Sequence, residues 1–222
     1  MLYGRRKGPK LSAHQAHLRE TLLPQLSLRL EHGRDPRSYF SPPAEDVWLE
    51  VGYGGGEHLL WQAEHNPHVG LIGAEPYEGG TAKLLSKLEA ARARNLRLYE
   101  GDAREIVDML PDASIGRVFI LFPDPWPKTR HHKRRFIQME MLDRLARVTR
   151  PGAELRFATD DATYLLWALE RIAAHPMFEW TAACAADWTT RPPDWPQTRY
   201  EAKAIQGPPA YLRFRRSARL QA

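Results

Sequence analysis

The stretch Val47-Trp-Leu-Glu-Val-Gly-Tyr-Gly-Gly-Gly-Glu57 decides the fold that we predict for this chain. Its first five residues are mostly apolar and predict a buried strand, and the glycines predict a tight turn into a helix that starts near Glu57. Glycine lets the backbone turn sharply and approach a ligand that a side chain would block. Because many strand–helix turns contain glycine, this stretch needs support from the residues around it.

Strand-like and helix-like segments alternate along most of the sequence. This alternation predicts an α/β fold in which a mainly parallel sheet has helices on both faces. We expect strands at residues 47–51, 69–74, 96–99, 118–121, 154–158 and 210–214, and helices at residues 13–32, 57–64, 79–92, 103–110, 133–148 and 161–173. The stretch 187–200 is rich in Pro and Trp, so we expect a long ordered loop that could reach toward a ligand.

The 222 residues are expected to form a basic N-terminal extension, 1–35, and one domain, 36–222. The extension should contain a helix and a start that could be flexible. No apolar run is long enough for a membrane span, and the basic N-terminus lacks the apolar core of a signal peptide. The single cysteine, Cys184, excludes an intramolecular disulfide. These features predict a cytoplasmic protein.

No metal site is expected. A zinc site rich in cysteine is excluded by the single cysteine, and His131 and His132 lack the spacing of metal ligands with a nearby Cys or Glu. The sequence therefore indicates chemistry that does not depend on a bound metal.

Four consecutive predicted strands end in an acidic residue: Glu50, Glu75, Asp102 and Asp124. Each acid alone could be a helix N-cap or a solvated strand end. Because ligands bind at the carboxyl ends of parallel strands, we expect the four acids to line one crevice. Glu75 could hold ribose hydroxyls and Asp102 could accept from the exocyclic amine of adenine. An acidic crevice disfavours the pyrophosphate of NAD and suits S-adenosylmethionine, which has a ribose, an adenine, an ammonium and a sulfonium.

A proline-rich loop and a dense basic run follow the fourth predicted strand, in Leu121-Phe-Pro-Asp-Pro-Trp-Pro-Lys-Thr-Arg-His-His-Lys-Arg-Arg135. Three prolines stiffen the loop, which carries the carboxylate of Asp124, the aromatic ring of Trp126 and the ammonium of Lys128. An aromatic ring beside dense positive charge suits a polyanion that carries flat rings, which describes a nucleic acid. The alternative is an exposed, solvated basic loop.

The net charge of +5 is modest, so the distribution of the basic residues matters more than their sum. Basic clusters lie within residues 5–10, 128–135 and 213–219. If the fold brings them to one face, they would form a track for phosphates. If they scatter, they only solubilise the protein.

Together these segments resemble the bacterial tRNA (guanine-N7)-methyltransferases. The match runs in order from about Glu50 to Phe214, and the Phe-Pro-Asp-Pro-Trp-Pro-Lys segment is highly specific to that family. The matching segments are Glu50-Val-Gly-Tyr-Gly-Gly-Gly56, Gly73-Ala-Glu75, Gly101-Asp102, Phe122-Pro-Asp-Pro-Trp-Pro-Lys128, Arg130-His-His-Lys-Arg-Arg135, Thr159-Asp160 and Thr198-Arg-Tyr-Glu201. The resemblance implies a Rossmann-like class I methyltransferase fold with a seven-stranded sheet. It also implies methyl transfer from S-adenosylmethionine to N7 of the variable-loop guanine, position 46, of tRNA.

The resemblance implies roles for individual residues. The cofactor-binding residues would be Glu50, Gly52, Gly54, Glu75, Asp102 and Asp124, and Asp124 would also be catalytic. The substrate-binding residues would be Lys128, Asp160, Thr198, Arg199, Tyr200 and Glu201. The RNA-binding run would be Arg130, His131, His132, Lys133, Arg134 and Arg135. A second acid, Asp161, directly follows Asp160, so either of the two could face the substrate.

Two alternative functions stay open from the sequence. One is methyl transfer to another RNA base, and the other is RNA binding without catalysis. The sequence does not distinguish a monomer from a homodimer.

Overall fold

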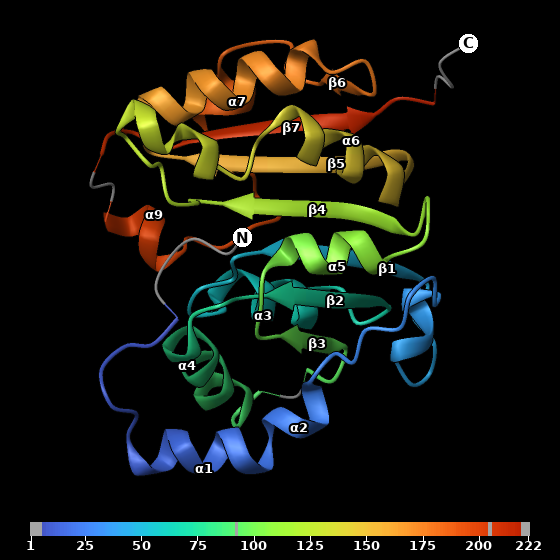
Figure 1. Ribbon diagram of the computed structural model, residues 1–222, viewed down its shortest axis with the longest axis vertical. Helices are drawn as coiled ribbons and strands as arrows, with labels where there is room; N and C mark the ends of the chain where they lie inside the picture. The colour runs from blue at the N-terminus through green and yellow to red at the C-terminus, as the bar shows by residue number, and fades with distance from the viewer. Residues whose placement is uncertain (1–5, 92, 204–205, 219–222) are drawn as a thin grey trace. The chain divides into compact units, whose positions relative to one another are not determined.

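The structure is a computed structural model that describes residues 6–91, 93–203 and 206–218; the side chains of Tyr200 and Lys203 lie outside this description. The chain divides into two compact units, Met1–Pro111 and Asp112–Ala222. The described residues contain seven strands, which Figure 1 colours from blue to red along the chain.

The first unit is built on three parallel strands in the order β3-β2-β1. They are β1 (Asp46–Val51), β2 (Val69–Ala74) and β3 (Leu96–Tyr99). Parallel neighbours need a long crossover connection, usually a helix. The crossovers are α3 (Glu57–His65) and α4 (Glu78–Leu88), and α5 (Ala103–Met109) follows β3. Val47, Leu49, Leu71 and Ile72 are fully buried. The predicted alternation of strands and helices is confirmed for this unit.

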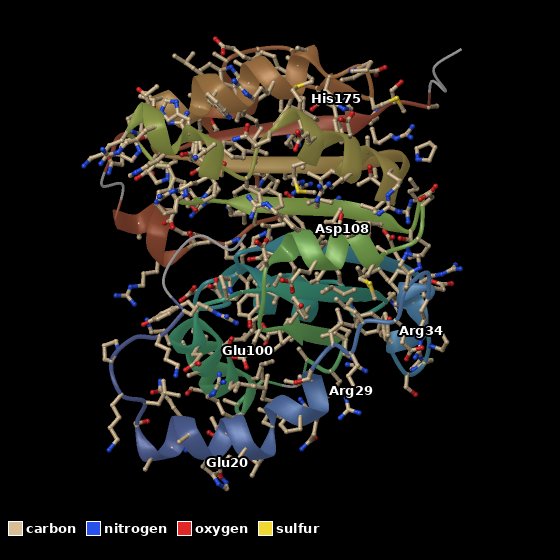
Figure 2. The ribbon with its side chains drawn as sticks, viewed as in Figure 1. Glu20, Arg29, Arg34, Glu100, Asp108 and His175 are labelled. Atoms are coloured by element: carbon tan, nitrogen blue, oxygen red, sulfur yellow. The ribbon has the colours of Figure 1, made fainter. Side chains whose placement is uncertain are left out.

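Two short helices precede the first strand, α1 (Ala13–Thr21) and α2 (Leu23–Leu26), and a 3-10 turn, η1 (Pro36–Tyr39), follows them. Helix α1 contacts α4, and Arg19 of α1 pairs with Glu100, labelled in Figure 2, with N–O distances of 2.5 and 3.0 Å. The prediction of one helix over residues 13–32 is wrong. Pro24 lies in the first turn of α2, where its missing N–H costs nothing, and it cannot continue the hydrogen bonding of α1.

The second unit contains four strands in the order β4-β5-β7-β6. They are β4 (Ile115–Leu121), β5 (Thr149–Thr159), β6 (Phe178–Trp180) and β7 (Ala210–Arg216). Strand β4 is parallel to β5, whereas β7 is antiparallel to both β5 and β6. Helices α6 (Met139–Val148) and α7 (Ala162–Ala174) pack on β5. His175, labelled in Figure 2 at the end of α7, places its Nε2 3.2 Å from Asp143 Oδ1 of α6.

The segment before α6 differs from the predicted helix 133–148. A 3-10 helix, η2 (Thr129–Arg134), is followed by an extended turn, and α6 starts only at Met139. The backbone N–H groups of Phe136 and Ile137 donate to the hydroxyl of Tyr164, at 3.0 and 3.3 Å, instead of to helical carbonyls. A contact with α7 therefore replaces the first turns of the predicted helix.

The stretch 187–200 is ordered and has short helices at its ends, α8 (Ala186–Thr189) and α9 (Arg199–Lys203). Trp195 is buried and meets Tyr211 edge-on, with ring centroids 5.3 Å apart. Asp194 accepts a 2.8 Å bond from the buried Arg156 of β5. An aromatic anchor and an ion pair thus hold this stretch on the sheet.

The basic cluster at residues 213–219 does not lie on one face. Directly opposite residues of paired strands share a face, and Arg213 and Arg215 lie opposite Arg156 and Glu154 of β5. Arg216 points to the other face, where its Nε donates to Ala146 O at 3.2 Å. Residues 1–5 and 219–222, which include Arg5 and Arg219, lie outside the described residues. Within the described ranges, no helix has the length and apolarity needed to cross a membrane.

Candidate active site

Three buried acids lie at the carboxyl ends of the strands in the first unit. Glu50 is the second-last residue of β1, Glu75 directly follows β2, and Asp102 caps α5 after β3. All three residues are at most 8% exposed. Because the three strands are parallel neighbours, their carboxyl ends meet at the same edge of the sheet. The structure therefore places these three predicted acids on one edge.

Glu50 is held by a histidine of the helix that follows its strand. His58 of α3 donates from Nδ1 to Glu50 Oε2 at 2.7 Å, and the two side chains are 1% and 3% exposed. Gln62 lies one turn further and donates from Nε2 to His58 Nε2 at 3.2 Å. Asn66 in turn donates to Gln62 Oε1 at 3.0 Å. This chain of hydrogen bonds keeps the imidazole proton on Nδ1, so that the ring can orient the carboxylate of Glu50.

Glu75 connects the glycine loop to the second strand. Its Oε2 accepts from the N–H of Gly54 at 2.8 Å, and its Oε1 accepts from the N–H of Tyr77 at 2.9 Å. Gly52 and Gly54 have φ of 72° and 53°, the left-handed region that favours glycine. A Cβ atom on Gly80 of α4 would lie 2.5 Å from the Gly54 carbonyl oxygen. The loop is therefore packed tightly and held by the acid that ends the neighbouring strand.

Asp102 has a structural partner of its own. Its Oδ1 accepts from the backbone N–H of Arg104 at 3.0 Å as the N-cap of α5, and its Oδ2 lies 3.0 Å from Arg104 Nη1. The helix cap and the guanidinium both hold the carboxylate in place. A ligand amine bound by Asp102 would share this carboxylate with Arg104.

In the second unit, Asp124 lies in a loop with unusual backbone geometry. Phe122 and Trp126, which both precede a proline, have φ of 49° and 46°. This conformation is rare for bulky residues and persists only where the surrounding structure holds it. The N–H of Phe122 still donates to Ala158 O of β5 at 2.7 Å. Asp124 is exposed to solvent, yet the protein atoms around its carboxyl group remove enough water to raise its pKa above the usual range.

The two acids after β5 have different surroundings. Asp161 is buried and caps α7, since its Oδ1 accepts from Tyr164 N at 2.7 Å and from Thr163 Oγ1 at 2.6 Å. Asp160 is half-buried, and its Oδ2 accepts from the N–H of Gln206 at 3.2 Å. Because β4 and β5 are parallel neighbours, Asp124 and Asp160 belong to the same edge of this unit's sheet. Asp161 is occupied as a cap, so Asp160 is the better candidate for a ligand contact.

The Thr198-Arg-Tyr-Glu201 segment forms a capping box at the start of α9. Thr198 Oγ1 accepts from Glu201 N at 3.2 Å, and Glu201 Oε2 accepts from Thr198 N at 3.3 Å. Glu201 is buried and its Oε1 also accepts from the hydroxyl of Tyr211 at 2.7 Å. Burial and the adjacent carboxylate raise the pKa of that hydroxyl. Arg199 is exposed, and the side chain of Tyr200 lies outside the described part of the structure.

The basic run does not present all of its residues to solvent. Lys128, Arg130 and Lys133 are exposed, whereas His131, His132 and Arg134 are half-buried. The guanidinium of Arg134 lies 4.9 Å from the ring centre of Trp126, a cation–π distance. Arg135 differs from these six residues because it is only 1% exposed. This burial disfavours the RNA-binding role that the resemblance implies for Arg135, because the side chain has little surface to offer a phosphate.

The sequence analysis missed His58, Gln62 and Arg104, although they hold two of the predicted acids. A signal for the first two exists, because His58, Gln62 and Asn66 follow each other at intervals of four residues along α3. That spacing puts polar side chains on one face of a helix. Among the described residues, no group of three or more His, Cys, Asp or Glu side chains could hold a metal ion.

We expect His58→Ala to lower the free energy of unfolding by about 1–3 kcal/mol, because it leaves the buried carboxylate of Glu50 without this hydrogen-bond donor. His65→Ala is the matched control, since it removes an exposed histidine from the same helix. Denaturant unfolding of the two variants and the wild type measures the difference. Equal stability of the two variants would contradict the role of the buried pair.

Comparisons with known proteins identify the family of this chain. Residues 44–210 match the model of a family described as "Putative methyltransferase". The tRNA (guanine-N(7)-)-methyltransferase of Rhodospirillum rubrum is 50% identical over 98% of this chain and 88% of that protein. The enzyme of the same name from Rhizobium meliloti is 48% identical over 97% of this chain and 94% of that protein.

Solved structures support the fold alone. The 16S rRNA methyltransferase KamB superposes with a TM-score of 0.54 at 18% identity, covering 86% of this chain and 98% of that one. A mutant of the 16S rRNA (adenine(1408)-N(1))-methyltransferase from Catenulisporales acidiphilia gives 0.55 at 16% identity, covering 87% and 100%. These matches confirm the predicted Rossmann-like class I methyltransferase fold. With relatives at about half identity over nearly its whole length, the chain belongs to the bacterial tRNA (guanine-N7)-methyltransferase family.

Proposed function

We propose that this chain transfers a methyl group from S-adenosylmethionine to N7 of a guanine in tRNA, at position 46 of the variable loop. The observation that carries the proposal is the strained loop that presents Asp124 immediately before a basic run in which Lys128, Arg130 and Lys133 are exposed. The names of the relatives support tRNA as the substrate, and position 46 is our own assignment. Such an enzyme would work in the cytoplasm, where tRNA is found.

The donor set of the first unit supports S-adenosylmethionine as the methyl donor. Carboxylates accept hydrogen bonds from hydroxyl and amino groups and attract positive charge. Three carboxylates lie beside the glycine loop, which packs so closely on α4 that a Cβ atom at Gly80 would collide with it. We propose that Glu50, Glu75 and Asp102 hold the cofactor, with Gly52 and Gly54 allowing its close approach to the backbone. When bound, the cofactor supplies an electrophilic methyl group carried on a positively charged sulfur.

The chemistry asks the protein mainly for orientation. Guanine N7 has an in-plane lone pair and no proton, so no general base is needed to activate it. The purine gains positive charge as it accepts the methyl group, and a nearby carboxylate stabilises that charge. We assign this electrostatic and orienting role to Asp124, together with a share in cofactor binding.

Recognition of the base and of the RNA would come from other residues of the second unit. Asp160 can accept from N1–H and N2–H₂ of guanine, a donor pattern that adenine lacks. Lys128, Arg130 and Lys133 are exposed and suit phosphate contacts, which hold RNA without reading its sequence. Thr198 and Glu201 would act by building α9, which carries the exposed Arg199.

The decisive experiment incubates the purified protein with unmodified tRNA and labelled S-adenosylmethionine. Borohydride–aniline treatment then cuts the RNA at 7-methylguanine, which identifies the modified position. Label without cleavage would indicate another RNA base, and tRNA binding without label would indicate a non-catalytic protein. Cleavage at another guanine would overturn position 46 alone.

We expect Asp124→Asn to lower kcat by about 10²–10³, the loss seen when one group that stabilises transition-state charge is removed. Its tRNA affinity should stay within a few-fold of wild type, because the carboxylate would repel the phosphates rather than hold them. Single-turnover kinetics and filter binding measure both quantities. Asp112→Asn, at the opposite end of β4, is the matched control. A variant that loses tRNA binding while keeping its rate would contradict the assignment.

The raised pKa of Asp124 predicts the acid side of the pH profile. Only the ionised carboxylate can stabilise the cationic purine, so kcat/KM should fall as the pH drops through the raised pKa of the free enzyme. The fall should therefore begin at a higher pH than for an ordinary aspartate. The same group lowers the free energy of unfolding as the pH rises from the ordinary to the raised value, because the native state binds the proton more tightly. A rate profile with its acid limb at the ordinary value would refute the prediction.

Removing two exposed cations, with Arg130→Ala and Lys133→Ala together, should weaken tRNA binding. The slope of log K against log salt should become shallower by about 1.5–2 units, because two fewer counterions are released. Titrations at several salt concentrations measure the slope. Arg144→Ala with Arg150→Ala removes the same charge from exposed positions outside the run and should leave the slope unchanged.

A further inference from the structure

We infer that Arg135 is a positioning residue that ties the loop 122–128, which carries Asp124, to the start of α7. Its catalytic consequence rests on the proposed function, whereas its effect on the loop does not. Arg135 therefore differs in role from the other basic residues between 128 and 135, because a buried guanidinium that holds the loop does not bind phosphate.

The contacts of Arg135 lead to the loop on one side and to α7 on the other. Its Nε donates to the carbonyl oxygen of Pro125 at 2.8 Å, and its Nη2 donates to Thr163 Oγ1 at 2.9 Å. The guanidinium carbon lies 4.9 Å from the ring centre of Tyr164 and 5.0 Å from that of Trp167. The planar fork of arginine thus joins two segments that lie 38 residues apart, from Pro125 to Thr163.

Burying this cation is costly, because the acceptors of its hydrogen bonds are the carbonyls of Pro125 and Thr163 and the Thr163 hydroxyl, all of them neutral. The loss of water around the guanidinium lowers its pKa. Asp161 attracts the guanidinium from a distance, but a buried charge that is not hydrogen-bonded to a carboxylate is expensive unless its other hydrogen bonds are well formed. A residue whose only task were to fill space would be apolar here, so the polar contacts themselves must be the reason for arginine at this position.

The strained backbone of the loop 122–128 must be held in place, and the contacts of Arg135 do this. Pro125 lies between Asp124 and Trp126, and the backbone is left-handed at Phe122 and again at Trp126. Each such residue is strained and persists only when neighbours hold it. The bond from Arg135 to the Pro125 carbonyl restrains the loop between its two strained positions. It acts at the residue next to the proposed catalytic carboxylate.

On the α7 side, the contact of Arg135 with Thr163 leads to the acids that follow β5. Thr163 accepts from Arg135 and donates from the same hydroxyl to Asp161 Oδ1 at 2.6 Å. Asp161 caps α7 and directly follows Asp160. Arg135 and Thr163 therefore connect the loop of Asp124 with the segment of Asp160, the two acids that would face the guanine from this unit.

The test compares Arg135→Lys and Arg135→Ala with the wild type. Lysine keeps the charge but cannot reach both acceptors with one ammonium, so both variants should lower kcat about 10–100-fold. The KM for tRNA and the salt slope of binding should stay within about twofold of wild type. A phosphate contact would give the opposite result, in which Arg135→Lys preserves activity and Arg135→Ala weakens tRNA binding and flattens the slope by about one unit. That result, or an unchanged kcat in both variants, would overturn the inference.

Hydrogen exchange provides a readout that does not depend on activity. Arg135→Lys should speed exchange of the amides of Asp124, Trp126 and Lys128 relative to wild type, while peptides of the first unit keep their rates. Thr163→Val removes one acceptor from outside the basic run and should speed exchange in the same loop, whereas Thr163→Ser keeps the hydroxyl and should not. If the Arg135 variants fail to fold, the Thr163 pair decides the question, and unchanged exchange in Thr163→Val would overturn the inference. A wild-type protein that does not methylate tRNA would refute the proposed function and leave this result standing.

Discussion

A buried carboxylate must have hydrogen-bond donors, and in each unit this requirement shapes the strand ends at which the acids lie. The loop or helix beside each acid supplies a donor: a histidine of α3 for Glu50, the N–H of Gly54 in the loop before α3 for Glu75, and the first turns of α5 and α7 for Asp102 and Asp161. The acids are therefore oriented before any ligand arrives. Such preorganisation is what binding and electrostatic stabilisation of charge both need.

The arginines and lysines between residues 128 and 135 have two kinds of surroundings. Arg130 and Lys133 extend into solvent, where a cation attracts phosphates at little cost. Arg135 points inward, where it contacts the aromatic ring of Tyr164 and neutral oxygen atoms. Arg134 is intermediate in exposure and lies over the ring of Trp126. The eight residues from Lys128 to Arg135 can therefore supply both an electrostatic surface and the internal support of the loop beside it.

The periodicity of the sequence predicted most of the sheet correctly, since apolar runs bounded by glycine, proline or acids mark β1 to β4 within a few residues. The start of α6 could not be predicted, because the hydroxyl of Tyr164 takes the N–H groups of Phe136 and Ile137. The capping box of Thr198 and Glu201 has a recognisable spacing that we interpreted only as ligand contacts. Arg135 could not be distinguished from its neighbours, because burial depends on α7, which follows much later in the sequence.

The position of β7 has a consequence for how the protein is made. This strand comes late in the sequence, at Ala210–Arg216, yet it lies between β5 and β6 and pairs with both. During synthesis β5 and β6 emerge first and wait with open hydrogen-bonding edges until β7 inserts between them. The first unit has all three of its strands by Tyr99 and can form its sheet much earlier. A nascent chain therefore passes through a stage in which one half is folded and the other is exposed to chaperones and proteases.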